Sequence, residues 1–134
     1  MGGKLSEGIN FKDHLARVVI CISLPFPNVK SPEIVERMSY YDGVNASGPG
    51  QQGDGFSGCE FYQNLCMRVV NQSIGRAIRH KDDFAMILLI DERYSRDSIK
   101  KSLPSWILNR CENFESFNVE ELAKEIGQFF QDKY

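Results

Sequence analysis

Two short apolar runs constrain the fold more than any other feature of this sequence. Val18–Leu24 is rich in β-branched residues and stops at Pro25, and Phe84–Ile90 stops at Asp91. Continuous apolar runs of this length are typical of strands that are buried on both faces. A helical segment lies between them, and strands joined by a crossing helix run parallel in one sheet. The sequence therefore predicts an α/β domain with a parallel sheet flanked by helices.

Composition limits the number of domains and the class of protein. The chain has 134 residues and a mass of 15.3 kDa, enough for one domain with its own hydrophobic core. Apolar residues make up 42% and charged residues 25%, which excludes wholesale disorder. The net charge of −2 argues against a histone-like coat protein but allows a local basic patch for nucleic acid. No apolar run approaches the roughly 18 residues of a membrane span, so we expect no membrane partner.

Helical signals fill much of the remaining chain. Ser31 followed by Pro32 predicts the start of a helix of about three turns. Residues 60–80 predict one long helix. Lys100–Arg110 predicts two short helical pieces broken at a proline, with Trp106 as a buried packing anchor in preference to a partner surface.

Two further segments lie outside the predicted core. Residues 43–58 contain six glycines and almost no core material, which indicates a mobile surface loop within the domain. In the tail, Asn118 and Glu121 have the spacing of a capping box. An apolar stripe follows the cap and consists of Val119, Leu122, Ile126, Phe129 and Phe130. We therefore expect residues 118–133 to form an amphipathic helix docked on the domain, with an acidic outer face.

The cysteines do not form a metal-binding pattern. The four are Cys21, Cys59, Cys66 and Cys111. No pair has the two-residue gap of a zinc or iron–sulfur clip. Cys21 lies in an apolar run and Cys66 in a helical stripe, which predicts buried thiols in a reducing compartment. We assign no metal ligands to this chain.

The predicted helix over residues 60–80 has one polar and basic face. On a helical wheel, Arg68, Gly75, Arg76 and Arg79 all lie within about 60° of Gln72. The opposite side is apolar and can pack on the sheet. A glycine inside a helix costs roughly 1 kcal/mol, a cost that makes sense where a ligand must approach the backbone closely.

This face has two interpretations. Two arginines three residues apart are suited to clamping an anion such as a terminal phosphate. By spacing alone, a solvated basic face is favoured, with Asp82 and Asp83 as neighbours that balance its charge.

The amino-terminal segment, Gly2–Gly8, also has two interpretations. It fails the Walker pattern because Lys4 is not followed by Ser or Thr, but a tight turn there would offer backbone N–H groups to a ligand.

Both segments resemble motifs of one enzyme family. Gly2–Phe11 resembles motif V of the XPD/FANCJ-like iron–sulfur DNA helicases of superfamily 2, and Gln72–His80 resembles their motif VI. Three other segments are similar to the chromosome-loss (ChlR) branch of that family: Leu24–Asn28, Asn64–Met67 and Asp91–Tyr94. The resemblance runs from Gly2 to about residue 107. It implies the C-terminal part of the second RecA-like lobe, a partial sheet of the P-loop NTPase type.

The resemblance also implies roles for the motif VI residues. In such helicases ATP sits between two lobes, and the second lobe supplies the arginines. By position, Arg79 would be the arginine finger on the γ-phosphate, and Arg76 would lie beside it. Gln72 would position the phosphate or the attacking water, and Gly75 would let the helix approach the cleft. A cation placed where charge develops during phosphoryl transfer contributes about 10³–10⁵ in rate.

The motif V residues divide between two ligands. Those implied to face the nucleotide are Gly3, Glu7, Gly8 and Asn10. Those implied to touch the DNA backbone are Lys4 and Ser6. Asn10 departs from the aspartate that is common in the family, so it keeps a hydrogen-bonding oxygen but loses the charge.

Several parts of a complete helicase are absent from the sequence. It has no Walker A loop, no Asp-Glu-Ala-His box for magnesium and none of the cluster cysteines. The resemblance implies that ATP and Mg²⁺ are bound mainly by the first RecA-like lobe, and that the 4Fe–4S cluster belongs elsewhere in the complete protein. It further implies DNA and the first lobe as partners, a nuclear location and a role in genome maintenance or chromosome cohesion. We expect that this chain alone neither hydrolyses ATP nor unwinds DNA.

Two hypotheses follow. The first is a piece of a helicase motor, truncated at its N-terminus because no strand precedes the glycine-rich segment. The second is a catalytically inactive stand-alone lobe that binds nucleic acid or protein. Residues 60–81 carry a net charge of +3 and residues 112–134 a net charge of −4. A basic cleft with an acidic outer helix fits a lobe that closes on ATP better than a free DNA-binding module, in which phosphate contacts dominate affinity.

Overall fold

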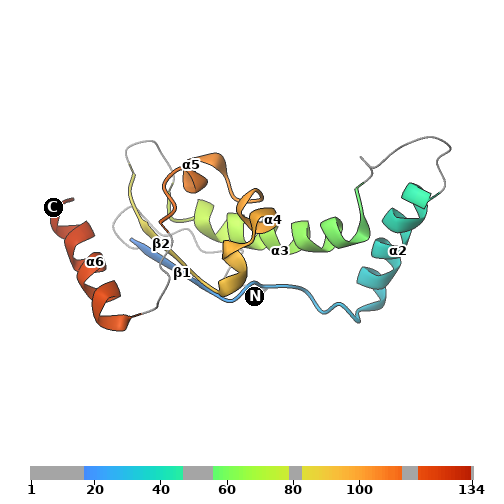
Figure 1. The fold of residues 1–134 in the computed structure, drawn as a ribbon, viewed down its shortest axis with the longest axis horizontal. Helices are drawn as coiled ribbons and strands as arrows, with labels where there is room; N and C mark the ends of the chain where they lie inside the picture. The colour runs from blue at the N-terminus through green and yellow to red at the C-terminus, as the bar shows by residue number, and fades with distance from the viewer. Residues whose placement is uncertain (1–16, 47–55, 79–82, 113–117, 134) are drawn as a thin grey trace.

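The computed structural model describes residues 17–46, 56–78, 83–112 and 118–133 (Figure 1). Its elements are, in chain order, β1 (Val18–Ile22), α2 (Pro32–Ala46), α3 (Gly58–Gly75), β2 (Met86–Ile90), the 3₁₀ helix η1 (Glu92–Ser95), α4 (Asp97–Lys100), α5 (Ser105–Leu108) and α6 (Val119–Gln131). Among the described helices, none is long and apolar enough to cross a membrane.

The two strands form a parallel sheet, as the sequence predicts. Val18 lies opposite Met86 and Ile22 opposite Ile90, with α2 and α3 between the strands in the chain. β1 ends two residues before the predicted run does, because Ser23 adopts a positive φ of 66°. This left-handed conformation turns the chain out of the strand direction.

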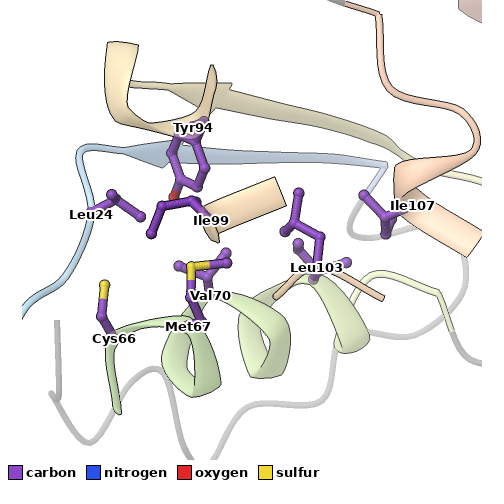
Figure 2. Packing of buried hydrophobic residues seen from close by; sticks show 9 residues of the cluster. Leu24, Cys66, Met67, Val70, Tyr94, Ile99, Leu103 and Ile107 are labelled. Carbon is purple, nitrogen blue, oxygen red and sulfur yellow. The ribbon is translucent and has the colours of Figure 1, made fainter. Parts of the chain in front are cut away.

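The hydrophobic core lies on one face of this sheet. Its buried cluster consists of Leu24, Cys66, Met67, Val70, Ile74, Tyr94, Ile99, Leu103 and Ile107. In Figure 2, Met67 and Val70 of α3 point toward Ile99 and Leu103 from the segment around α4. The apolar side of α3 is therefore the buried side, which confirms the prediction from its helical wheel.

The second face of the sheet differs from the prediction. In β1, the side chain of Ile20 is 50% exposed and that of Ile22 is 67% exposed. Burial of both strand faces is therefore wrong for β1 within the part of the chain that the structure describes. The physical reason is that burial of both faces needs a second layer of helices, and the described residues place their buried cluster on one side only.

The connection between α2 and α3 is shorter than the predicted glycine-rich loop over residues 43–58. α2 continues to Ala46 and α3 begins at Gly58. The helix extends this far because a single glycine inside a helix costs only about 1 kcal/mol. Residues 47–55 lie outside the described residues. Across the connection, the Gly58 N–H donates to Oδ1 of Asp42 at 2.8 Å, so the end of α2 is joined to the start of α3.

A capping box begins α3. The Glu60 N–H donates to the Ser57 hydroxyl oxygen at 3.1 Å, and the Ser57 N–H donates to the Glu60 carboxylate at 2.8 Å. The Ser57 N–H and the Ser57 hydroxyl both donate to the Glu60 carboxylate, and these two hydrogen bonds lower the pKa of Glu60. The capping box satisfies two N–H groups that the first turn of a helix would otherwise leave without partners.

The segment after β2 forms two one-turn helices, α4 and α5, separated by Pro104 as predicted, although α4 begins earlier than expected. Trp106 is 42% exposed, so the prediction of a buried anchor is wrong. Ile107 is buried in its place. Neighbouring residues on a helix point in different directions, and only one of them can face the core from a single turn.

α6 is the last described element and lies at the opposite end of the molecule from α2 (Figure 1). The Glu120 N–H donates to Oδ1 of Asn118 at 2.9 Å, so the cap differs from the predicted box with Glu121. No residue of α6 is buried. Its contact with the domain includes the ring of Phe129, whose centroid lies 6.2 Å from that of Phe84.

Candidate functional site

The polar face of α3 ends at a helix terminus. α3 stops at Gly75, Arg76 forms its C-cap, and the Arg76 N–H donates to the Ser73 carbonyl oxygen at 3.3 Å. A bond of this i to i+3 type tightens the last turn, and glycine favours helix termination. The prediction of a helix to about residue 80 is therefore wrong. The shared helical face is defined as far as Gly75, and Arg79 lies outside the described residues.

Three of the predicted site residues are described, and they lie together at this terminus. The side chain of Gln72 and the residue Gly75 are exposed, and Arg76 is half-buried. A Cβ added at Gly75 would meet no atom within 4 Å. The backbone at Gly75 therefore borders open space, which is the condition for a ligand or a second lobe to approach it closely.

The other side of the same terminus is anchored in the core. Ile74 is fully buried and Ala77 is 5% exposed. Ala77 also donates its N–H to the Ile74 carbonyl oxygen at 3.0 Å. Because interiors are close-packed, these contacts fix the orientation of the polar residues next to them.

At the amino-terminal ends of both strands, the structure shows an ion pair that the sequence did not predict. Nη1 of Arg17 lies 2.5 Å from Oδ1 of Asp83. The Asp83 side chain is 2% exposed and that of Arg17 is 18% exposed. The interpretation of Asp83 as a neighbour that balances a solvated basic face is therefore wrong. The two residues are 66 positions apart, and no spacing rule connects them.

A second ion pair lies at the carboxyl-terminal ends of the strands. Nε of Arg93 donates to Oδ1 of Asp91 at 2.9 Å, and Nη2 donates to Oδ2 at 2.7 Å. Nη2 also donates to the Ser23 hydroxyl oxygen at 3.1 Å, and the guanidinium carbon lies 5.6 Å from the centroid of Phe26. The hydrogen bonds from Arg93 hold the pKa of Asp91 well below its usual range. This pair joins the ends of β1 and β2 through side chains.

Comparison with known proteins places these features in a family. The model of the helicase C-terminal domain matches residues 1–110. This chain belongs to the helicase C-terminal domain family. It is 53% identical to the ATP-dependent DNA helicase DDX11 of Mus musculus, over 99% of this chain and 14% of that protein. It is 44% identical to the ATP-dependent DNA helicase chl1 of Schizosaccharomyces pombe, over 99% of this chain and 15% of that protein.

The matches confirm the resemblance to the ChlR branch of the XPD/FANCJ-like helicases. The chain spans about one seventh of the length of these relatives. The helicase C-terminal domain match ends at residue 110, so α6 lies beyond it, whereas the two relatives match nearly the whole chain.

The predicted motif V residues lie outside the described residues of this helicase domain. They are Gly3, Lys4, Ser6, Glu7, Gly8 and Asn10. The described part of the domain ends on the motif V side at Arg17, which lies in the ion pair with Asp83.

The cysteines of the helicase domain differ in their exposure to solvent. Cys21 and Cys66 are buried, which confirms the predicted burial of these two thiols, and Cys59 and Cys111 are exposed. Burial raises the pKa of Cys66 to about 11, so this thiol is protonated at neutral pH. Within the described ranges, no group of three or more His, Cys, Asp or Glu side chains is placed to hold a metal ion.

Proposed function

We propose that this chain is part of the C-terminal motor lobe of an ATP-dependent DNA helicase, and that it supplies arginines to ATP hydrolysis. The observation that carries the proposal is the terminus of α3. There Gln72 and Gly75 are exposed, Arg76 caps the helix, and a fully buried Ile74 holds the terminus in place. These residues belong to motif VI, and the exposure of Gln72 and Gly75 leaves room for a second lobe to contact them.

The chemistry required of this lobe is electrostatic. During phosphoryl transfer negative charge spreads over the transferred group, and a preorganised guanidinium there contributes about 10³–10⁵ in rate. We assign this role to Arg79 as the arginine finger, with Arg76 beside it. Gln72 orients the phosphate or the attacking water. The open space beside Gly75 lets the helix approach the nucleotide cleft closely.

The motif V segment completes the site in this proposal. Gly3, Glu7, Gly8 and Asn10 face the nucleotide. Lys4 and Ser6 contact the DNA backbone, as a cation and a hydroxyl group commonly do. ATP and Mg²⁺ are held mainly by the first RecA-like lobe, where the metal neutralises phosphate charge.

The other proposed properties concern the complete protein. We place a 4Fe–4S cluster outside this chain, because two of its cysteines are buried, two are exposed, and the described residues bring no three His, Cys, Asp or Glu side chains together to hold a metal. The partners are DNA, ATP and the first lobe, in the nucleus, with a role in genome maintenance or chromosome cohesion. The alternative, a catalytically inactive stand-alone interaction module, has less support because relatives carry this region as 14–15% of a longer helicase.

The test requires the complete helicase that contains this segment. Arg79→Ala is expected to reduce ATP turnover by about 10³-fold or more, because the developing charge loses its counter-charge. Nucleotide affinity is expected to fall only modestly. Arg76→Lys is also expected to lower turnover, because an ammonium group cannot reproduce a bidentate guanidinium. Steady-state ATPase rates and nucleotide binding by fluorescence titration measure both effects.

The matched control is Arg37→Ala. Arg37 is an exposed arginine of α2 that pairs with Glu33 on the surface, and its loss is expected to leave turnover unchanged. If Arg79→Ala keeps turnover within a few-fold of the wild type, the arginine finger lies elsewhere and the proposal is wrong.

A further inference from the structure

We infer that Arg17 and Asp83 are positioning residues for ATP hydrolysis: their buried ion pair fixes the chain at the start of the sheet, four residues after Arg79. The inference rests on the proposed function of Arg79. It concerns two residues that neither the motifs nor their spacing single out.

The first observation is the number of interactions between Arg17 and the residues at the start of β2. Besides its contact with Asp83, Nη1 of Arg17 donates to the Phe84 carbonyl oxygen at 2.8 Å. The Arg17 guanidinium lies 4.2 Å from the centroid of the Phe84 ring. In the backbone, the Met86 N–H donates to the Arg17 carbonyl oxygen at 2.8 Å. Arg17 is thus joined to three residues at the beginning of β2 and its approach.

The second observation is burial. The Asp83 side chain is 2% exposed. Its burial is unexpected from the sequence, because the four residues before it (79–82) include an arginine, a lysine and an aspartate. Removing a carboxylate from water is costly, and buried ion pairs are weak sources of stability. Their hydrogen bonds are directional, however, so such a pair restricts geometry more than an apolar contact does. The pair is therefore suited to positioning.

The third observation is where the pair lies in the chain. Asp83 follows Arg79 by four residues, so an extended chain places their Cα atoms at most about 14 Å apart. On the other side, Ala77 precedes Arg79 by two residues and is buried. The segment with Arg79 is therefore bounded by two anchored residues. Arg17 follows the motif V segment, which ends at Phe11, by six residues. The ion pair thus joins a residue six positions after the motif V segment to a residue three positions after the motif VI segment.

A positioning role predicts a particular kinetic signature in the complete helicase. Asp83→Asn removes the charge and keeps the shape, and is expected to lower kcat by on the order of 10–100-fold, the usual effect of misplacing a reacting group by about 1 Å. The KM for ATP is expected to stay within about threefold of the wild type, because the proposed ground-state contacts lie elsewhere. Arg17→Gln is expected to act like Asp83→Asn. Arg17→Lys keeps the charge and is expected to recover part of the rate.

The control breaks an ion pair of the same type on the surface. Arg37→Gln removes the partner of Glu33, where the two side chains are 57% and 70% exposed. It is expected to leave kcat and the unfolding midpoint unchanged.

A double-mutant cycle separates positioning from general stability. Arg79→Lys, measured by single-turnover hydrolysis, provides a reduced but detectable rate. If Asp83 acts through Arg79, Asp83→Asn is expected to slow the Arg79→Lys enzyme much less than it slows the wild type, because interacting residues are not additive. Equal losses in both backgrounds would overturn the inference and assign the pair a structural role.

The outcomes also separate this inference from the proposed function. If Arg79→Ala retains turnover, the arginine finger assignment fails first. If Arg79→Ala abolishes turnover but Arg17→Lys and Asp83→Asn both keep kcat within about twofold, only the positioning inference fails. If Asp83→Asn does not fold, Arg17→Gln decides: a lower kcat at an unchanged unfolding midpoint supports positioning, and an unchanged kcat overturns it.

Discussion

Arg93 shows how a single side chain joins the ends of the two strands. Its guanidinium donates to both carboxylate oxygens of Asp91 and to the hydroxyl of Ser23, the residue with a positive φ. A left-handed conformation is uncommon outside glycine and persists where surrounding contacts determine it. The ion pair provides such a contact at the point where the chain leaves β1.

This pair predicts how stability depends on pH. The hydrogen bonds from Arg93 lower the pKa of Asp91 in the folded state, so the folded chain binds this proton more weakly than the unfolded chain does. The stabilisation is complete above the unfolded value near pH 3.9 and is lost as the pH falls through the folded value. Arg93→Gln is expected to lower the free energy of unfolding at pH 7 and to make its loss in acid less steep.

Urea unfolding of the 134-residue chain at pH 7, 4 and 3 measures this dependence. Glu33→Gln is the control, since Glu33 is 70% exposed in its ion pair and its loss is expected to change little. An Arg93→Gln chain with the wild-type slope in acid would show that Arg93 does not set the pKa of Asp91.

Alanine substitutions at two glycines of α3 are expected to change the free energy of unfolding in opposite directions. At Gly58 a Cβ would lie 2.6 Å from the Met38 carbonyl oxygen and 2.8 Å from Oδ2 of Asp42. Gly58→Ala is therefore expected to lower the free energy of unfolding by about 1–3 kcal/mol, the usual cost of overpacking. Gly75→Ala meets no atom within 4 Å and is expected to raise it by up to about 1 kcal/mol.

Urea denaturation of the two variant chains measures both effects, and each serves as the control for the other. If Gly75→Ala destabilises the chain, the space beside Gly75 is filled. A stabilised Gly75→Ala chain combined with slower ATP turnover in the complete helicase would support a functional reason for this glycine.

At the scale of elements, α3 joins the core to the candidate site. One side of the helix is packed against the sheet and the segment around α4, where Met67, Val70 and Ile74 are almost inaccessible to water. The Ser57 capping box satisfies two N–H groups at its start, Asp42 accepts from the Gly58 N–H, and the helix stops at Gly75. The position of the site residues is therefore set by a helix that is fixed at its start, along its apolar side and at its end.

Because α3 packs in the core, truncation of an isoleucine there is expected to cost more stability than truncation of an isoleucine on the exposed face of β1. Ile74→Ala is expected to lower the free energy of unfolding by about 2–5 kcal/mol, because Ile74 is fully buried and truncation leaves a cavity. Ile20→Ala, on the 50% exposed face of β1, is expected to change it by no more than about 0.5 kcal/mol. Urea unfolding of both variant chains measures the difference. A comparable loss for Ile20→Ala would mean that this face of the sheet is covered in solution.

At the scale of the whole molecule, the elements differ in how strongly they are held. The sheet, α3 and the segment around α4 share the buried cluster, with α2 at one end and α6 at the other (Figure 1). α6 has no buried residue. Its Phe129 ring lies near the Phe84 ring, and Lys133, two residues after the helix, lies over the same ring. Local unfolding is easiest where few apolar contacts are buried.

This difference predicts the pattern of amide hydrogen exchange. Amides of residues 119–131 are expected to exchange at least about 10²-fold faster than those of residues 66–74, because opening α6 disrupts little buried surface. Phe129→Ala is expected to increase exchange in α6 and to leave α3 unchanged. Mass spectrometry of peptides from the two helices measures both. Equal protection of the two helices would show that α6 unfolds only with the core.

The sequence by itself determined which side of α3 is apolar, that the two strands are parallel, and which family the motifs belong to. It could do so because periodicity, β-branched runs and helix signals are local properties of the chain. Only the tertiary structure decided that Arg17 meets Asp83, that Ile107 is buried in place of Trp106, and that one face of β1 is exposed. Contacts between distant residues depend on how the strands pair and which layers cover them, and neither is encoded in the spacing of neighbouring residues.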